Sequence, residues 1–180
     1  MTYRFPMVLL IAALSGPAGA QEERAEATIF DFLREGDALP TVESVRELEA
    51  MAQNELEAEN CEGAIPLLRQ WARQAEAVSD MLDQGSQPRL AATPETQTSF
   101  LSNSEVATYE RTRLLTSTRF LLLDRNRALV QEAQCLHALG RTNEAAVAAY
   151  QALEFIEIHQ TDEWDSARYL LWDIAGFDYE

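Results

Sequence analysis

The feature that most constrains this fold is an apolar stripe between about residues 62 and 82. Apolar side chains recur there at every third or fourth position, at Ala64, Leu68, Trp71, Ala75, Val78 and Leu82. This spacing places them on one face of an α-helix, and the alternation typical of β-strands is nearly absent from the chain. Such a face is stable when it packs against other helices, so we expect an all-α protein.

Similar periodicity predicts further helices over residues 27–35, 41–58, 104–139, 142–159 and 161–175. We expect Thr41 and Thr142 to cap the helices that follow them, and Gly140 to end the long helix before it. The run 120–123 (FLLL) indicates a segment that is covered on more than one side. Residues 83–103 are rich in Ser, Thr, Gln, Gly and Pro, which predicts one long loop, either disordered or functional.

The first twenty residues have the layout of a cleaved secretory signal. Arg4 precedes the apolar run 7–14 (MVLLIAAL), and Ala18-Gly19-Ala20 provides the small residues that a signal peptidase reads. The run is too short to span a bilayer, which takes about 20 residues. We therefore predict a mature chain that begins at Gln21, lies in the periplasm or outside the cell, and has no membrane insertion after cleavage.

The charge balance excludes several kinds of partner. The 180 residues include 30 acidic and 14 basic ones, a formal net charge of −16, and every basic residue is arginine. Nucleic acids and anionic membranes need a basic surface, so we expect neither as a partner. An acidic surface favours a basic partner, or serves only to keep the protein soluble.

Chemistry-bearing residues are sparse. Cys61 and Cys135 either form a disulfide or are two separate buried thiols, and the sequence leaves both alternatives open. His137 and His159 are the only histidines, and we find no cluster of metal ligands, no phosphate-binding loop and no nucleophile motif. We expect no cofactor and no metal, and a binding protein rather than an enzyme.

Two aromatic residues lie off the apolar stripe of the last predicted helix. Tyr169 and Trp172 would be exposed there, next to Phe177 and Tyr179 near the end of the chain. Exposed Trp and Tyr side chains are typical of binding hot spots, so we predict an interaction patch at this end of the protein.

Residues 126–159 resemble a tetratricopeptide repeat (TPR), a pair of antiparallel helices of about 34 residues. Ala133, Ala145 and Ala152 occupy the small-residue positions, and Leu129 and Leu136 occupy large ones. A looser copy includes Leu48, Ala52, Ala64 and Leu68. Three departures stand out: Glu132 replaces a Leu, Ala149 replaces an aromatic residue, and Trp71 replaces a small one.

The resemblance implies a short stack of antiparallel helical hairpins with a C-terminal capping helix, and a partner-binding surface on the first helix of each pair. Carried onto this sequence, that surface comprises Arg127, Val130, Gln134 and His137 in the better copy and Arg46, Glu49 and Gln53 in the looser one. The implied function is an adaptor or scaffold for another exported protein or peptide. The alternative is an acidic inhibitor or immunity-type protein that binds one basic enzyme.

Overall fold

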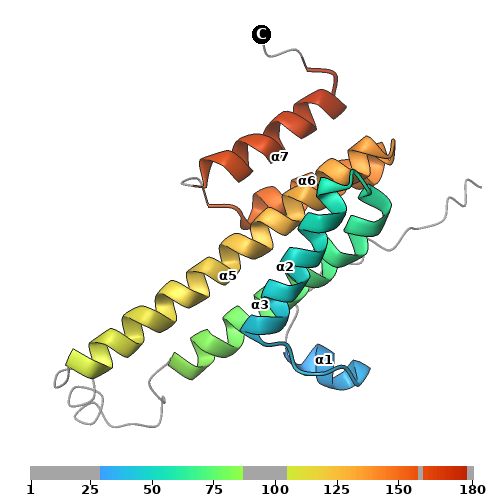
Figure 1. Ribbon diagram of the computed structural model, residues 1–180. Coiled ribbons are helices and arrows are strands. Elements are labelled where there is room, and N and C mark those ends of the chain that lie inside the picture. Colours follow the sequence, from blue (N-terminus) through green and yellow to red (C-terminus); the bar gives the residue numbers. More distant parts are fainter. Residues whose placement is uncertain (1–28, 87–104, 158–159, 178–180) are drawn as a thin grey trace, which may run out of the picture.

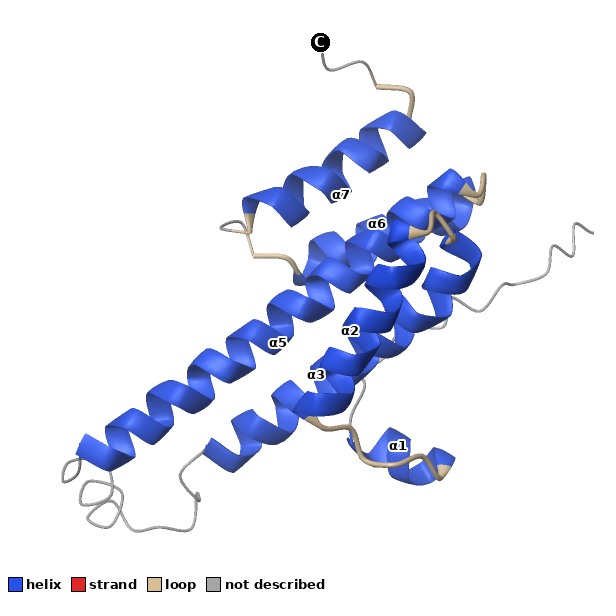
Figure 2. Cartoon of the chain, viewed as in Figure 1, coloured by secondary structure: helices blue, strands red, loops and turns tan. Residues whose placement is uncertain are grey.

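The computed structural model describes residues 29–86, 105–157 and 160–177, and every regular element in these ranges is an α-helix (Figures 1 and 2). The helices are α1 (Ile29–Glu35), α2 (Val42–Glu57), α3 (Cys61–Ser86), α5 (Glu105–Ala138), α6 (Thr142–Phe155) and α7 (Thr161–Ile174). The prediction of an all-α protein is confirmed. The predicted signal sequence lies outside the described residues.

From α2 onward, the helices pack in the order in which they follow one another along the chain. α2 contacts α3, α3 contacts α5, α5 contacts α6, and α6 contacts α7. α5 also contacts α7, while α1 contacts α3 alone. Because α2, α3, α5, α6 and α7 each pack against the next described helix in sequence, this bundle is compatible with a helical repeat-like fold.

The two longest helices, α3 and α5, form the central pair of the bundle. α3 and α5 lie side by side, and α6 and α7 pack at the C-terminal end of α5 (Figure 1). The prediction of one continuous helix through residues 124–126 is confirmed. The predicted loop 83–103 begins too early, because α3 continues to Ser86, and the remainder of that loop lies outside the described residues. α6 ends at Phe155, four residues before the predicted end.

The start of α2 and the end of α5 follow known capping rules, whereas the starts of α6 and α7 have no side-chain cap bond. Thr41 and Ser44 form a reciprocal capping box at the start of α2, where each side chain accepts a hydrogen bond from the other residue's backbone N–H. Gly140 has φ +73° after α5, and the N–H of Arg141 reaches the carbonyl of Leu136 at 2.9 Å, a Schellman ending. Thr142 was expected as a cap but is the first residue of α6; Arg141 occupies the cap position and makes no side-chain cap bond.

The core is built from a few large side chains and many alanines. Trp71, Leu68, Leu136 and Val45 are almost completely buried. Alanines fill the close approaches between helices: Ala52, Ala64, Ala75, Ala128, Ala133, Ala145, Ala149, Ala152 and Ala167 are all 0% exposed. Small side chains let neighbouring helix backbones come close together, which explains Ala64 and Ala75 in the apolar stripe of α3. The expectation that residues 120–123 are covered on more than one side is wrong, because Phe120 is 60% exposed.

A buried polar network attaches the link between α6 and α7 to α5. Asn126, which is 2% exposed, donates from Nδ2 to the carbonyl of Phe155 at 3.3 Å and to Oε1 of Gln160 at 2.7 Å. Arg125 donates to Oδ1 of Asn126 and to Glu76 on α3, each at 3.0 Å. The network therefore connects α3, α5 and the start of α7, and its bonds compensate for the burial of its polar groups.

Candidate partner-binding surfaces

Five of the residues that the TPR resemblance points to lie along a row of polar side chains on α2 and α5: Arg46, Glu49, Gln53, Arg127 and Gln134. We call this row the polar seam and define it as Arg46, Glu49, Gln53, Asp124, Arg127, Gln131 and Gln134. The Nη1 of Arg127 lies 3.1 Å from Oε1 of Glu49 and 3.7 Å from Oδ1 of Asp124. The Nε2 of Gln53 donates to Oε1 of Gln131 at 3.2 Å. Side chains that are far apart in sequence are thus joined across two helices.

Asp124 is the residue of the polar seam whose pKa departs from its ordinary value. Partial burial of its carboxyl group, and secondarily the nearby charge of Glu49, raise the pKa of Asp124 above its ordinary value, while Arg127 and Arg46 oppose the rise. Arg127 and Glu49 are each about one-third to two-fifths exposed, at 42% and 32% of their side chains. These groups remain accessible to a partner that offers a complementary charge or an amide.

Not every predicted residue lies on the surface. Val130 was expected to bind a partner, but only 4% of it is exposed and it belongs to the hydrophobic core, so this prediction is wrong. The reason is that α5 packs against α3 and also against α6 and α7, which leaves a narrower outer face than a single helical hairpin would have. Gln134 and Arg46 are exposed, and Nη1 of Arg46 lies 3.9 Å from Oε2 of Glu43.

His137 is half-exposed and connects α5 to the last helix. Its Nε2 lies 3.0 Å from Oδ2 of Asp173, and 36% of its side chain is accessible. Its Nδ1 is buried and makes no hydrogen bond. His137 therefore continues the polar residues of α5 beyond the polar seam toward α7. Its imidazole contacts α7 and is not directed at α2.

The aromatic residues expected at the C-terminal end are brought together. The rings of Tyr169 and Trp172 meet edge to face with centroids 5.5 Å apart, and Phe177 approaches Trp172 at 5.4 Å. The guanidinium carbon of Arg168 lies 4.7 Å from the Trp172 centroid and 5.0 Å from that of Tyr169. Phe177 is 56% and Tyr169 is 38% exposed, whereas Trp172 is half-buried; Tyr179 lies outside the described residues.

The two cysteines are bonded to each other. Cys61 at the start of α3 and Cys135 near the end of α5 form a disulfide with a Cα–Cα distance of 5.0 Å and a sequence separation of 74. Of the two alternatives that the sequence leaves open, the structure has the disulfide. The bond links α3, which packs with α2, to α5, which packs with α6. Cys135 is next to Gln134, at the end of the polar seam closest to α7.

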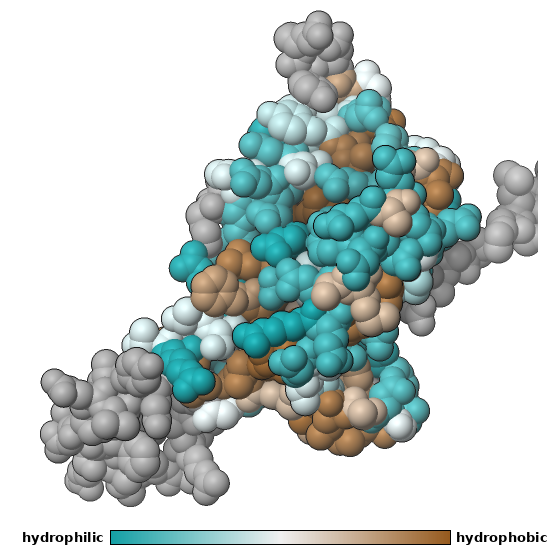
Figure 3. All heavy atoms as spheres, in the orientation of Figure 1, coloured by the Kyte–Doolittle hydropathy of each residue, from teal (hydrophilic) through white to brown (hydrophobic). Residues whose placement is uncertain are grey.

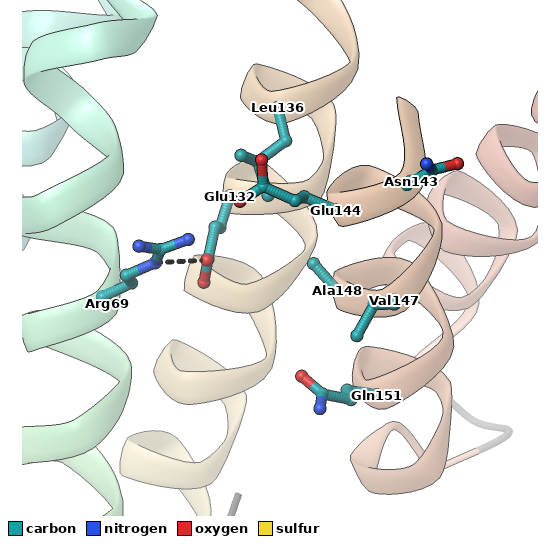
Figure 4. A pocket seen from close by; sticks show the side chains of 8 residues that line it. All are labelled: Arg69, Glu132, Leu136, Asn143, Glu144, Val147, Ala148 and Gln151. Atoms are coloured by element: carbon teal, nitrogen blue, oxygen red, sulfur yellow. Dashed lines mark hydrogen bonds and ion pairs between the residues drawn. The ribbon is translucent and has the colours of Figure 1, made fainter. Parts of the chain in front are cut away.

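A groove between α3 and α6, with α5 as its floor, was not predicted (Figure 4). It has a volume of about 470 Å³. Its central contact is an ion pair of 2.6 Å between Nε of Arg69 and Oε1 of Glu132, whose side chain is 3% exposed. Asn143, Val147 and Gln151 project from α6 along the other wall (Figure 4).

One signal in the sequence could have located this groove. Glu132 stands on the buried face of its helix where the repeat family has Leu, and a buried carboxylate requires a cationic partner. Arg69 on α3 is that partner. Arg69 thus offsets the charge of Glu132 on the floor of the groove, while the wall formed by α6 carries the carboxylate of Glu144 beside the amides of Asn143 and Gln151.

Comparisons with protein-family models, with curated proteins and with solved structures found no match to this chain. In the ranges that the structure describes, no three His, Cys, Asp or Glu side chains are grouped so that they could hold a metal ion. None of the described helices combines the length and the hydrophobicity that a membrane crossing requires.

Proposed function

We propose that this protein is an exported, TPR-like interaction module that binds another exported protein or peptide, as an adaptor or scaffold in the periplasm. The observation that carries the proposal is the packing order of the helices, in which α2–α3 and α5–α6 form successive hairpins and α7 follows on α5. This is the neighbour relationship of a helical-hairpin stack.

The polar seam supports a binding role at the position that the resemblance implies. Its residues come from α2 and α5, the first helices of the two hairpins, and their side chains bridge the two helices. The charged and amide groups there remain partly exposed, which suits recognition of a polar or basic segment. The disulfide supports export, because such bonds persist in oxidising compartments.

The proposal is tested by cross-linking and capture from the periplasmic fraction with three variants of the tagged protein. Gln134→Arg alters the exposed end of the seam, and Trp172→Ala alters the C-terminal aromatic cluster. Gln70→Arg makes the same glutamine-to-arginine substitution at an exposed position of α3 and serves as the control. We expect loss of a specific partner with Gln134→Arg or Trp172→Ala and retention with Gln70→Arg. Retention of every partner by all three variants, with unchanged thermal unfolding, would reject these surfaces.

A second function, an acidic inhibitor of one basic enzyme, is favoured by the charge of α2. Glu43, Glu47 and Glu57 are exposed on this helix, and the chain carries a net charge of −16. This function predicts one-to-one binding that weakens steeply as salt rises, because association between exposed charges is screened. Binding that is insensitive to salt would favour the adaptor.

A further inference from the structure

The short helix α1 docks on α3 at a site that lies apart from the main hydrophobic core. Phe32 of α1 is 2% exposed, yet it does not belong to the core cluster that the described residues of α2, α3, α5, α6 and α7 form. Among the described helices, α1 contacts α3 alone, and it lies at the edge of the bundle (Figure 1). The burial of Phe32 therefore depends on the docking of α1 on α3.

Arg73 of α3 contacts α1 in two ways. Its guanidinium carbon lies 4.4 Å from the centroid of the Phe32 ring, and its Nη2 lies 2.6 Å from Oε2 of Glu35. The side chains of Arg73 and Glu35 are 33% and 48% exposed, so this ion pair is accessible to solvent while the ring is buried. Phe32 and Glu35 are three residues apart, which places them on one face of α1. The site on α3 thus receives an aromatic ring and a carboxylate that lie about one helical turn apart.

The opposite face of α1 is open, and the helix is connected to the bundle by a short segment. Phe30 is 69% and Leu33 is 56% exposed, and apolar surface is visible where α1 lies (Figure 3). The segment 36–41 leads to α2 and begins with Gly36, whose φ is +78° and which has open space where a Cβ would lie. A glycine in such a position can absorb the rotation of a hinge. α1 can therefore leave α3 while the core helices stay packed.

From these contacts we infer that α1 is a tethered ligand of α3, and that the site it covers binds a helical segment of a partner protein in which an aromatic residue is followed three residues later by a carboxylate. The occupant in the structure sets this chemistry, since the guanidinium of Arg73 attracts both the face of the ring and the carboxylate. The site lies on α3, whereas the polar seam lies on α2 and α5. The inference therefore does not depend on the function proposed for the seam.

The tether decides which occupant can displace α1. The α1 of a second copy offers the same contacts as the tethered α1, which a short linker holds at an effective concentration of about millimolar. A second copy at micromolar concentration therefore does not compete. A partner segment that offers the same two side chains and additional contacts does compete, so α1 limits access to the site.

Fluorescence anisotropy with a labelled peptide of residues 29–39 tests the inference, with the peptide in the place of the partner segment. We expect it to bind the Phe32→Ala variant of the whole protein at least tenfold more tightly than the wild type, because the tethered α1 of the wild type occupies the site. The variant should keep its helical circular dichroism, because Phe32 lies outside the core cluster. Equal binding to the two proteins, no binding to the variant, or loss of its helical signal would overturn the inference.

Two altered peptides distinguish the docking residue from its exposed neighbour. Phe32→Ala in the peptide should weaken binding to the Phe32→Ala protein at least tenfold, because the ring that stacks on Arg73 is removed. Phe30→Ala in the peptide is the matched control and should leave binding unchanged, since Phe30 is 69% exposed. Equal effects of the two substitutions would contradict the proposed site.

A charge reversal tests the second contact. In the Phe32→Ala protein, Arg73→Glu should weaken binding of the peptide about tenfold, and a peptide with Glu35→Arg should recover it. Arg113→Glu is the control, at an exposed position of α5, a helix that α1 does not contact. An unchanged affinity for Arg73→Glu would contradict the site. Sedimentation at micromolar concentration showing a wild-type dimer that Phe32→Ala abolishes would assign the site to a second copy and overturn the inference.

Discussion

At the scale of single residues, Glu59 shows how local backbone geometry limits stability. Glu59 follows α2 with φ 55°, and its N–H donates to the carbonyl of Leu56 at 3.0 Å, so it occupies the position that usually carries glycine in a Schellman ending. A side chain with a Cβ in this left-handed region is strained. We predict that Glu59→Gly stabilises the protein by about 0.5–1 kcal/mol.

Urea denaturation monitored by circular dichroism measures this change. Glu57→Gly, two residues earlier and within the last turn of α2, is the matched control. Glycine in a helix interior costs about 1 kcal/mol, so the control should lower stability. Stabilisation by both substitutions, or by neither, would show that the left-handed conformation is not the cause.

Asp124 provides a pH-dependent prediction at the same scale. Burial raises the pKa of this carboxyl group in the folded state, so its contribution to stability is fully present below the unfolded pKa of about 3.9 and is lost as the pH rises through the folded pKa. Asparagine resembles the neutral form. Asp124→Asn is therefore expected to be more stable than the wild type at pH 7, and the difference should close below about pH 4. Thermal unfolding between pH 3 and pH 8 checks this, and a difference that grows toward acid would contradict it.

At the scale of elements, the sequence predicts a helix and its buried face correctly where one face is apolar. It does not predict which side chains are buried where several helices pack against the same element. The stripe of α3 is confirmed because one periodic face meets the core. α5 has no such single face, so the burial of Val130 and the exposure of Phe120 depend on which neighbours cover each half of the helix. The pairing of Arg69 with Glu132, and of Cys61 with Cys135, likewise depends on distances between helices that no local pattern contains.

The junction between α5 and α7 rests on one buried amide. Asn126→Leu would leave the carbonyl of Phe155 and the side chain of Gln160 without the donor that Asn126 provides. An unsatisfied buried polar group costs about 1–3 kcal/mol, so we predict a loss of stability of at least that size. Urea denaturation compares it with Asn143→Leu, at an exposed position in the first turn of α6. Equal effects of the two substitutions would show that the network contributes little.

At the scale of the whole molecule, the disulfide between Cys61 and Cys135 cross-links the two hairpins. The disulfide closes a loop with a sequence separation of 74, which the chain-entropy model values at about 4–5 kcal/mol. We predict a loss of this size in the Cys61→Ser/Cys135→Ser double variant, measured by urea denaturation. The wild type in reducing agent should unfold with the double variant. Unfolding of the double variant together with the oxidised wild type would show that the bond does not stabilise the fold.

The same bond has a mechanical consequence. When the protein is stretched from its two ends, tension passes through the sulfur atoms, and the polypeptide between Cys61 and Cys135 cannot extend. At about 3.4 Å for each residue, the shielded segment removes about 250 Å from the length gained on complete unfolding. A single-molecule pulling trace of the oxidised protein should be shorter than that of the reduced protein by this amount, because the force that unravels α1, α2, α6 and α7 does not act on most of α3 and α5.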